Sequence, residues 1–114
     1  MERITVRKLY GLEDVLNKVA GTPMVPWKRD EHDRGKIIAQ VGNYHIYGAN
    51  GRTGVHQISS PTGGVRTVFG PGTKRETWMR LTAFIDGMIA EQERQAKHND
   101  LEQQQKVREG RKDS

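Results

Sequence analysis

Residues 36–70 read KIIAQVGNYHIYGANGRTGVHQISSPTGGVRTVFG, in which four short apolar runs alternate with turn residues. Gly42 with Asn43 matches a two-residue hairpin turn that begins with glycine, and Asn50 with Gly51 is the strongest hairpin signal in the chain. The residues that follow Gly51 suggest that this loop is longer than two residues, and a proline- and glycine-rich stretch makes a third turn. The segment therefore predicts an antiparallel meander of three to four strands.

The residues before this meander predict a strand, a helix and a connection. Residues 3–10 place Ile4 and Val6 on one side, which is typical of a short N-terminal strand. Apolar residues at i, i+3, i+4 and i+7 from Leu12 predict a short helix that ends at a glycine. Residues 22–35 show no period, so we expect an exposed connection there.

After the meander the apolar period becomes that of a helix. Thr73 and Glu76 form a capping-box pair ahead of an apolar stripe, which predicts a long helix over residues 73–92. Residues 98–114 hold too few apolar side chains for a core, so we expect a charged, glutamine-rich helical extension or a disordered tail behind a single domain of residues 1–97. The predicted fold class is α+β, with the meander packed against a short N-terminal helix and a long C-terminal helix.

The composition limits the classes of protein. The 114 residues include no cysteine, which excludes disulfide frameworks, thiolate zinc sites and iron–sulfur clusters. A chain of this length can bury one modest core, so two-domain enzymes are excluded. No apolar run approaches the roughly 20 residues of a membrane span, and the first residues lack the apolar core of a signal peptide. We therefore expect a cytoplasmic protein without a membrane partner.

Positive charge is concentrated in one part of the chain. Residues 34–75 are 42 residues with six bases and no acid, whereas acids alternate with bases in the C-terminal segment. A surface built from such a segment attracts polyanions. The alternative explanation is structural, because strands and glycine turns disfavour acids. The six bases are Arg34, Lys36, Arg52, Arg66, Lys74 and Arg75.

Aromatic and imidazole side chains lie within this acid-free segment. In the run that follows Asn43, Tyr44 shares one side with Ile46, while His45 shares the other side with Tyr47. Rings interleaved with bases suit nucleic acid, because a base stacks on the ring while a cation meets its phosphate. Ordinary strand residues would give the same pattern, and the sequence does not say which face is buried. The predicted nucleic-acid contacts are Arg52, Arg66, Lys74, Arg75, Tyr44, Tyr47 and His45.

The residues that join the last strand to the long helix are a second candidate for anion binding. Residues 70–75, GPGTKR, would bring backbone N–H groups, the helix dipole and two bases together. The spacing of a nucleotide-binding P-loop is absent, so we predict no nucleotide hydrolysis. A capped turn without a ligand is the simpler interpretation.

No catalytic or metal-binding constellation is predicted. His32 lies among three acids of the exposed connection, but this spacing matches no defined metal site. His45 and His56 could meet across a hairpin, yet that stretch has no carboxylate to orient either ring as a general base. We therefore expect a protein that is not an enzyme and that uses no metal or cofactor.

Two functions compete at this point. The order of a small meander and an amphipathic helix is similar to that of the integrase-type three-stranded DNA-binding domain and of double-stranded RNA-binding domains, which implies binding of DNA or RNA. The alternative is an interaction protein, similar to phage or mobile-element accessory proteins, that docks on a cellular protein. Trp27 would be its anchor, unless the indole only pins the connection over the core, and the C-terminal helix would allow a homodimer. Capture of a nucleotide or similar small anion at residues 70–75 is a third candidate.

Overall fold

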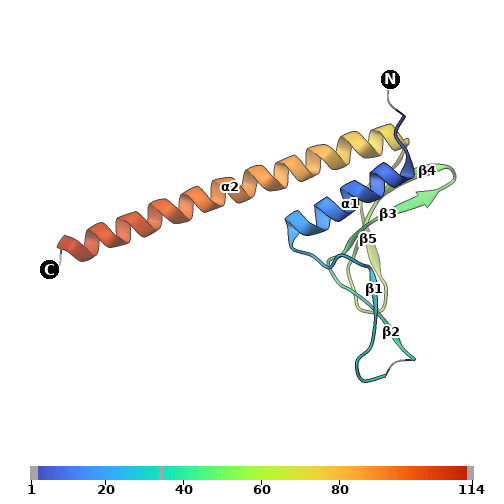
Figure 1. Cartoon of the computed structure of the whole chain (residues 1–114), viewed down its shortest axis with the longest axis horizontal. Helices are drawn as coiled ribbons and strands as arrows, with labels where there is room; N and C mark the ends of the chain where they lie inside the picture. The colour runs from blue at the N-terminus through green and yellow to red at the C-terminus, as the bar shows by residue number, and fades with distance from the viewer. Residues whose placement is uncertain (1–2, 34, 113–114) are drawn as a thin grey trace.

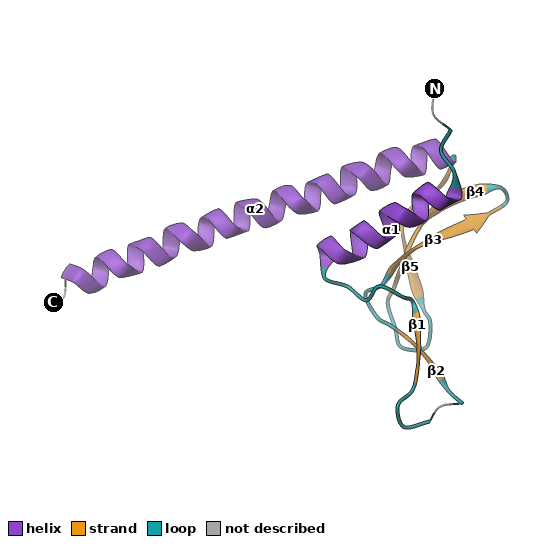
Figure 2. Cartoon of the chain, viewed as in Figure 1, coloured by secondary structure: helices purple, strands orange, loops and turns teal. Residues whose placement is uncertain are grey.

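The computed structural model describes residues 3–33 and 35–112 of the chain. The architecture is α+β, as predicted: an N-terminal helix, five short antiparallel strands in two small sheets, and a long C-terminal helix packed against them (Figure 1 and Figure 2). The elements are α1 (Val6–Ala20), β1 (Trp27–Arg29), β2 (Ile37–Ala39), β3 (Tyr44–Ala49), β4 (Arg52–Ile58), β5 (Val65–Gly72) and α2 (Lys74–Lys112).

The N-terminal strand predicted over residues 3–10 is wrong, because α1 begins at Val6. Thr5 is the N-cap of this helix, and its hydroxyl accepts a hydrogen bond from the Lys8 backbone N–H at 3.3 Å. Alternation of apolar residues over only four positions is a weak signal, and a threonine cap with a helical apolar stripe behind it outweighs it. The helix ends at Gly21, whose φ of 71° gives the left-handed cap that glycine favours.

The first strand of the predicted meander belongs to a separate hairpin. β2 pairs with β1 in a two-stranded sheet, with Trp27 opposite Ala39, and not with β3. The segment predicted as an exposed connection therefore contains a strand. Gly42, at a φ of 98°, marks a corner between two sheets and not a hairpin turn, and its N–H donates to the Ile58 carbonyl at 2.9 Å. Figure 1 shows the β1–β2 hairpin projecting away from the helices.

The remaining strands form the predicted meander in the order β3-β4-β5. Asn50 and Gly51 have φ values of 53° and 77°, so they form a two-residue turn of the type that suits a twisted hairpin. The longer loop predicted here is wrong, because Arg52 already pairs with Ala49. The turn predicted between β4 and β5 is confirmed.

The core lies between one face of this sheet and the two helices. Leu16 of α1, Val55 of β4 and Leu81 of α2 are each at most 1% exposed and belong to one cluster. Each such side chain contributes about 1.5–3 kcal/mol on burial. Register shifts between β4 and β5 accompany this packing, and both Val68 and Phe69 of β5 pack against the cluster.

α2 begins with the predicted capping box and continues beyond residue 92 into the segment for which a helical extension or a disordered tail was expected. The Thr73 N–H donates to the Glu76 carboxylate at 3.1 Å, and the Glu76 N–H donates to the Thr73 hydroxyl at 3.0 Å. α1 runs beside the first part of α2 up to Gln92, whose side-chain amide donates to the Val19 carbonyl. Beyond this point the helix continues to Lys112, well past the rest of the molecule in Figure 1. No helix in the described part of the chain is both long and apolar enough to cross a membrane.

α1 is attached to the open edge of β3 by polar side chains. The fully buried Asn17 amide donates to the Tyr44 carbonyl at 2.8 Å and accepts from the Tyr44 N–H at 2.9 Å. One turn earlier, the Glu13 carboxylate accepts from the Ile46 N–H at 2.7 Å. Partial burial raises the pKa of Glu13, while the Ile46 bond opposes this rise. These contacts satisfy main-chain groups of an edge strand that would otherwise pair with another chain.

We expect Asn17→Ala to lower the free energy of unfolding by about 2–4 kcal/mol, because both main-chain groups of Tyr44 would stay buried without a partner. Urea denaturation followed by circular dichroism measures this loss. Asp14→Ala on the exposed side of α1 is the control and should change stability little. Equal losses in the two variants would show that the Asn17 contacts are not what attaches the helix.

Candidate nucleic-acid interface

The two faces of the three-stranded sheet differ in what covers them. Thr53 of β4 points to the helices, since its hydroxyl lies 2.7 Å from that of Thr77 on α2. Side chains alternate along a strand, so Arg52, Gly54 and His56 face away from the helices. We call this side the outer face; the register adds their cross-strand partners. Its members are His45, Tyr47, Ala49, Arg52, Gly54, His56 and Thr67, and the same alternation continues to Ile58 and Val65, where Ile58 is only 2% exposed.

Three rings of the outer face form a cluster. Tyr47 and His56 are stacked, with ring centroids 3.7 Å apart and planes 14° from parallel. His45 meets His56 edge-on at 5.7 Å. Tyr47 also lies flat across β4, because a Cβ at Gly54 would be only 2.6 Å from its Cε1 atom. The glycine at this position is therefore needed for the ring to lie on the sheet, and all three rings stay partly exposed.

The two histidines of the cluster favour the neutral form. Burial lowers the pKa of His45, and the neighbouring His56 lowers it further. Burial also lowers the pKa of His56. Near neutral pH the cluster thus presents uncharged rings, and it gains positive charge when the pH falls.

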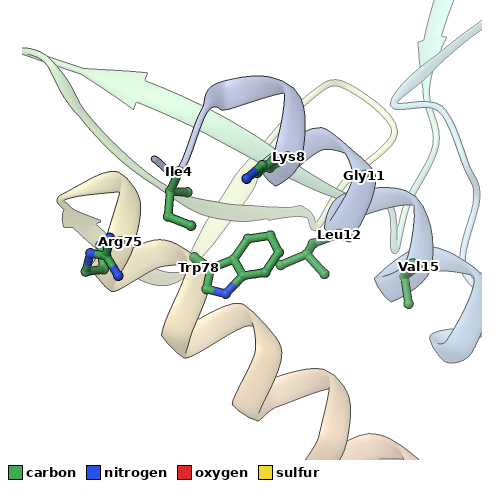
Figure 3. A pocket seen from close by; sticks show the side chains of 7 residues that line it. All are labelled: Ile4, Lys8, Gly11, Leu12, Val15, Arg75 and Trp78. Carbon is green, nitrogen blue, oxygen red and sulfur yellow. The ribbon is translucent and has the colours of Figure 1, made fainter. Parts of the chain in front are cut away.

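Three of the predicted bases lie toward the end of the sheet where α2 begins. Lys74 and Arg75 occupy the first turn of α2, and both are exposed. Arg52, at the start of β4, is close enough to Glu76 of the same turn to help lower the pKa of that carboxyl. These three bases are therefore near one end of the sheet, although Arg75 also lines a pocket between the starts of α1 and α2 (Figure 3).

Arg66 and Tyr44 lie elsewhere. Arg66 pairs with Gln57 in the strand register, and its Nε donates to the Gln57 side chain at 2.7 Å. It therefore projects on the side of the sheet that faces the helices, at the end away from Arg52. Tyr44 is 6% exposed, with its ring edge-on to Phe84 of α2 at 5.9 Å. A buried ring cannot stack on a base, so Tyr44 is not part of the candidate interface.

The start of α2 offers fewer backbone donors to an anion than predicted for residues 70–75. The Glu76 carboxylate already accepts from the Thr73 N–H. Hydrogen bonds from Thr73 are the main cause that holds the pKa of Glu76 below its usual value, and Arg80 forms an ion pair with it at 3.5 Å. A carboxylate of the protein thus sits where a phosphate would bind, and the simpler interpretation as a capped turn fits better.

Trp27 is packed on one side and exposed on the other, and its role as an anchor for a partner stays a prediction. Its indole lies against the turn between β4 and β5, since a Cβ at Gly63 would be 2.9 Å from its Cη2 atom. The Ala39 N–H also donates to the Pro61 carbonyl, which ties β2 to the same turn. Yet Trp27 is still 50% exposed. The ring therefore holds the β1–β2 hairpin against the turn between β4 and β5, and the other half of its surface stays exposed.

His56 is the residue of this site that the predicted contacts lack. A two-residue turn at Asn50 and Gly51 places His45 opposite His56, as the register shows. The sequence predicts that these two histidines could meet across a hairpin, but His56 is not among the predicted nucleic-acid contacts. In the described part of the chain no group of three or more His, Cys, Asp or Glu residues could hold a metal ion.

No protein-family model matches the chain, and neither a curated protein nor a solved structure matches it significantly. The functional argument therefore depends on the geometry of the chain itself.

The histidine cluster predicts a pH-dependent stability. Both folded-state pKa values lie below the unfolded value of about 6.5. Below that pH the unfolded chain binds more protons than the folded one. The free energy of unfolding should therefore be at its full value above pH ~6.5 and should decrease as the pH falls below it. A His45→Gln, His56→Gln double variant should flatten this slope in urea titrations at several pH values. An unchanged slope in the variant would assign the dependence to other groups.

Proposed function

We propose that the chain binds nucleic acid through the outer face of the three-stranded sheet and the first turn of α2. The observation that carries this proposal is the cluster of Tyr47, His45 and His56 on a face built wholly from an acid-free segment. Rings on an open sheet face accept unstacked bases, and nearby cations accept the phosphates. Arg52, Lys74 and Arg75 are the cations in this arrangement.

Three of the acids close to this segment in the sequence are engaged in local hydrogen bonds. Asp30 and Asp33 lie in the loop of the β1–β2 hairpin, where they accept from the N–H groups of His32 and Gly35. Glu76 is held by Thr73 and Arg80, as described above. No acid comes from the strands of the three-stranded sheet, so the outer face keeps a positive potential that favours polyanions.

The dimensions of the outer face fit a short stretch of nucleic acid. Arg52 and His56 are four residues apart on β4, which is about 13 Å along the strand. The rings of Tyr47, His45 and His56 lie on the same face, farther along the sheet than Arg52. Because stacking on a side chain requires bases that are not paired with each other, the cluster favours single-stranded segments.

Salt dependence tests the proposal directly. The triple variant Arg52→Gln, Lys74→Gln, Arg75→Gln should weaken binding to labelled single-stranded DNA and RNA, and should reduce the slope of log K against log salt by about two. The control triple Arg7→Gln, Lys97→Gln, Lys106→Gln removes the same charge from exposed positions of α1 and the distal part of α2. Fluorescence anisotropy at two or more salt concentrations measures both.

The comparison between the two triples decides the outcome. Equal losses would mean that net charge alone governs binding, and absence of binding by the parent protein would exclude the function. In the same assay Tyr47→Leu should weaken binding by about 1–3 kcal/mol without changing the salt slope, because it removes stacking and no charge. Circular dichroism of each variant establishes that the fold is retained.

A second candidate function is docking on a cellular protein through the base of the β1–β2 hairpin. Apolar side chains between 45% and 62% exposed gather in this part of the sequence, more than the hairpin itself can bury. They are Met24, Val25, Trp27, Ile37 and Val41.

We expect Trp27→Ala to abolish capture of such a partner from native extract, because it removes the largest ring of this group. Met79→Ala on α2 is the control, since Met79 is 63% exposed and lies outside the hairpin. Capture that survives Trp27→Ala, or that is lost equally in both variants, would contradict docking at this surface.

A further inference from the structure

The three-stranded sheet has two edges, and only one of them is covered. Along β3, side chains of α1 satisfy the main-chain groups, as described above. β5 pairs with β4 on one side, and no strand in the described part of the chain pairs with it on the other. An uncovered edge strand is a template on which a further strand can form.

The register shows which main-chain groups of β5 point outward. The Ser59 N–H donates to the Gly64 carbonyl at 2.7 Å, so Gly64 faces β4. Alternate residues of an antiparallel strand face the same neighbour, so Arg66 also faces β4, while Val65 and Thr67 face away. No described residue hydrogen-bonds to the main chain of Val65 or Thr67. Each of these two residues therefore offers an N–H group and a carbonyl to a partner.

The outward part of β5 is accessible and already extended. Val65 is 44% exposed, and Arg66 and Thr67 are exposed as well. β-Branched residues at positions 65 and 67 favour the strand conformation. The open segment ends at Thr67, because the register between β4 and β5 shifts after it. A partner strand thus needs no rearrangement of β5, but it finds only a short stretch on which to pair.

Arg66 gives this edge a positive charge. Its side chain lies on the side of the sheet that faces the helices, where its Nε donates to the Gln57 side chain at 2.7 Å. This bond uses only Nε and fixes the orientation of the guanidinium, so the two terminal nitrogens can meet a carboxylate as a pair. Neither β5 nor the neighbouring β4 contains an acid. A strand that adds to β5 is therefore favoured when it places an acid opposite Arg66.

A second copy of the chain fits this edge poorly. Two β5 strands related by a two-fold axis form the most hydrogen bonds when Val65 of each copy pairs with Thr67 of the other. This register places the two Arg66 side chains directly opposite each other, where like charges destabilise the pair. Centring the axis on Thr67 avoids the repulsion but leaves fewer hydrogen bonds, because Val65 then lies opposite Phe69, which is turned towards Val55 of β4.

We propose that the outer edge of β5 binds an extended acidic segment of another protein, which adds to the sheet as a fourth, antiparallel strand. Main-chain hydrogen bonds to Val65 and Thr67 hold the segment, and the contact of its acid with Arg66 selects it. The sequence that fits is an acid flanked on both sides by β-branched residues, which lie beside Val65 and Thr67. None of these three residues of β5 is among those proposed to contact nucleic acid.

A short peptide tests the main-chain pairing. The probe is the peptide TVEVT, dansyl-labelled at its N-terminus and amidated at its C-terminus. When its glutamate lies opposite Arg66, the N–H groups of both valines point to β5, and that of the glutamate points away. N-methylation of the first valine should therefore weaken binding at least about fivefold in fluorescence anisotropy. N-methylation of the glutamate adds the same methyl group and should change binding less than about twofold.

Exchange of charges tests the contact with the acid. Arg66→Glu should weaken the probe at least about tenfold, and should bind the peptide TVKVT more tightly than the parent protein does. Arg29→Glu is the control, since it makes the same change on an exposed residue of β1.

A proline at the edge tests the same pairing from the side of the protein. Thr67→Pro removes an N–H that β4 does not use, so it should weaken the probe at least about fivefold while the fold is retained. Thr67→Val keeps this N–H and should bind the probe as the parent protein does. Circular dichroism establishes that each variant is folded, and the N-methylated peptides give the same test on the unchanged protein.

The outcomes distinguish this proposal from nucleic-acid binding. The triple variant Arg52→Gln, Lys74→Gln, Arg75→Gln should still bind the probe, so either function can fail without the other. The edge proposal is overturned if the parent protein does not bind the probe, if it binds TVKVT as tightly, or if the two N-methylated peptides bind equally. Equal losses in Arg66→Glu and Arg29→Glu would also overturn it. Dimerisation of the parent protein in sedimentation equilibrium that is abolished by Thr67→Pro would assign the edge to a second copy and overturn the proposal as well.

Discussion

Asn17 holds the edge of the three-stranded sheet with both ends of its side-chain amide. The amide donates to one main-chain group of Tyr44 and accepts from the other, much as a neighbouring strand would. The Thr22 hydroxyl donates to the same Oδ1 atom at 2.8 Å, which helps to fix the amide orientation. Since Asn17 is fully buried, these bonds are made away from water. To form all of them, α1 must keep one position and one rotation relative to β3.

The candidate nucleic-acid interface follows from this attachment. With α1 fixed along β3 and α2 packed beside it, one face of the sheet is covered and the other is left open. The open face is the one on which Tyr47 and the two histidines meet. The same placement brings the first turns of α1 and α2 together. Side chains of both turns line a pocket around Trp78. A buried polar contact thus helps to decide which face of the sheet the helices cover.

The local signals of the sequence were sufficient for the class of fold and insufficient for its pairing. Glycine turns and the change of period located the meander and α2, because these depend on neighbouring residues. The partner of β2 depends on residues far along the chain, so β1 and the hairpin were missed. The outer face could have been predicted further: a two-residue turn pairs His45 with His56 by counting alone. The burial of Tyr44 could not, since it requires knowing where both helices lie.

The turn between β3 and β4 has a chemical consequence as well as a geometric one. Asn50 and Gly51 are both exposed, and the glycine N–H has no side chain beside it to hinder attack on the asparagine amide carbon. Attack there releases ammonia and forms a cyclic imide, which water opens to aspartate or isoaspartate. Either product places a carboxylate two residues before Arg52, in a segment that otherwise has no acid. Ageing of the protein would therefore weaken the positive potential of the outer face without any enzyme acting on it.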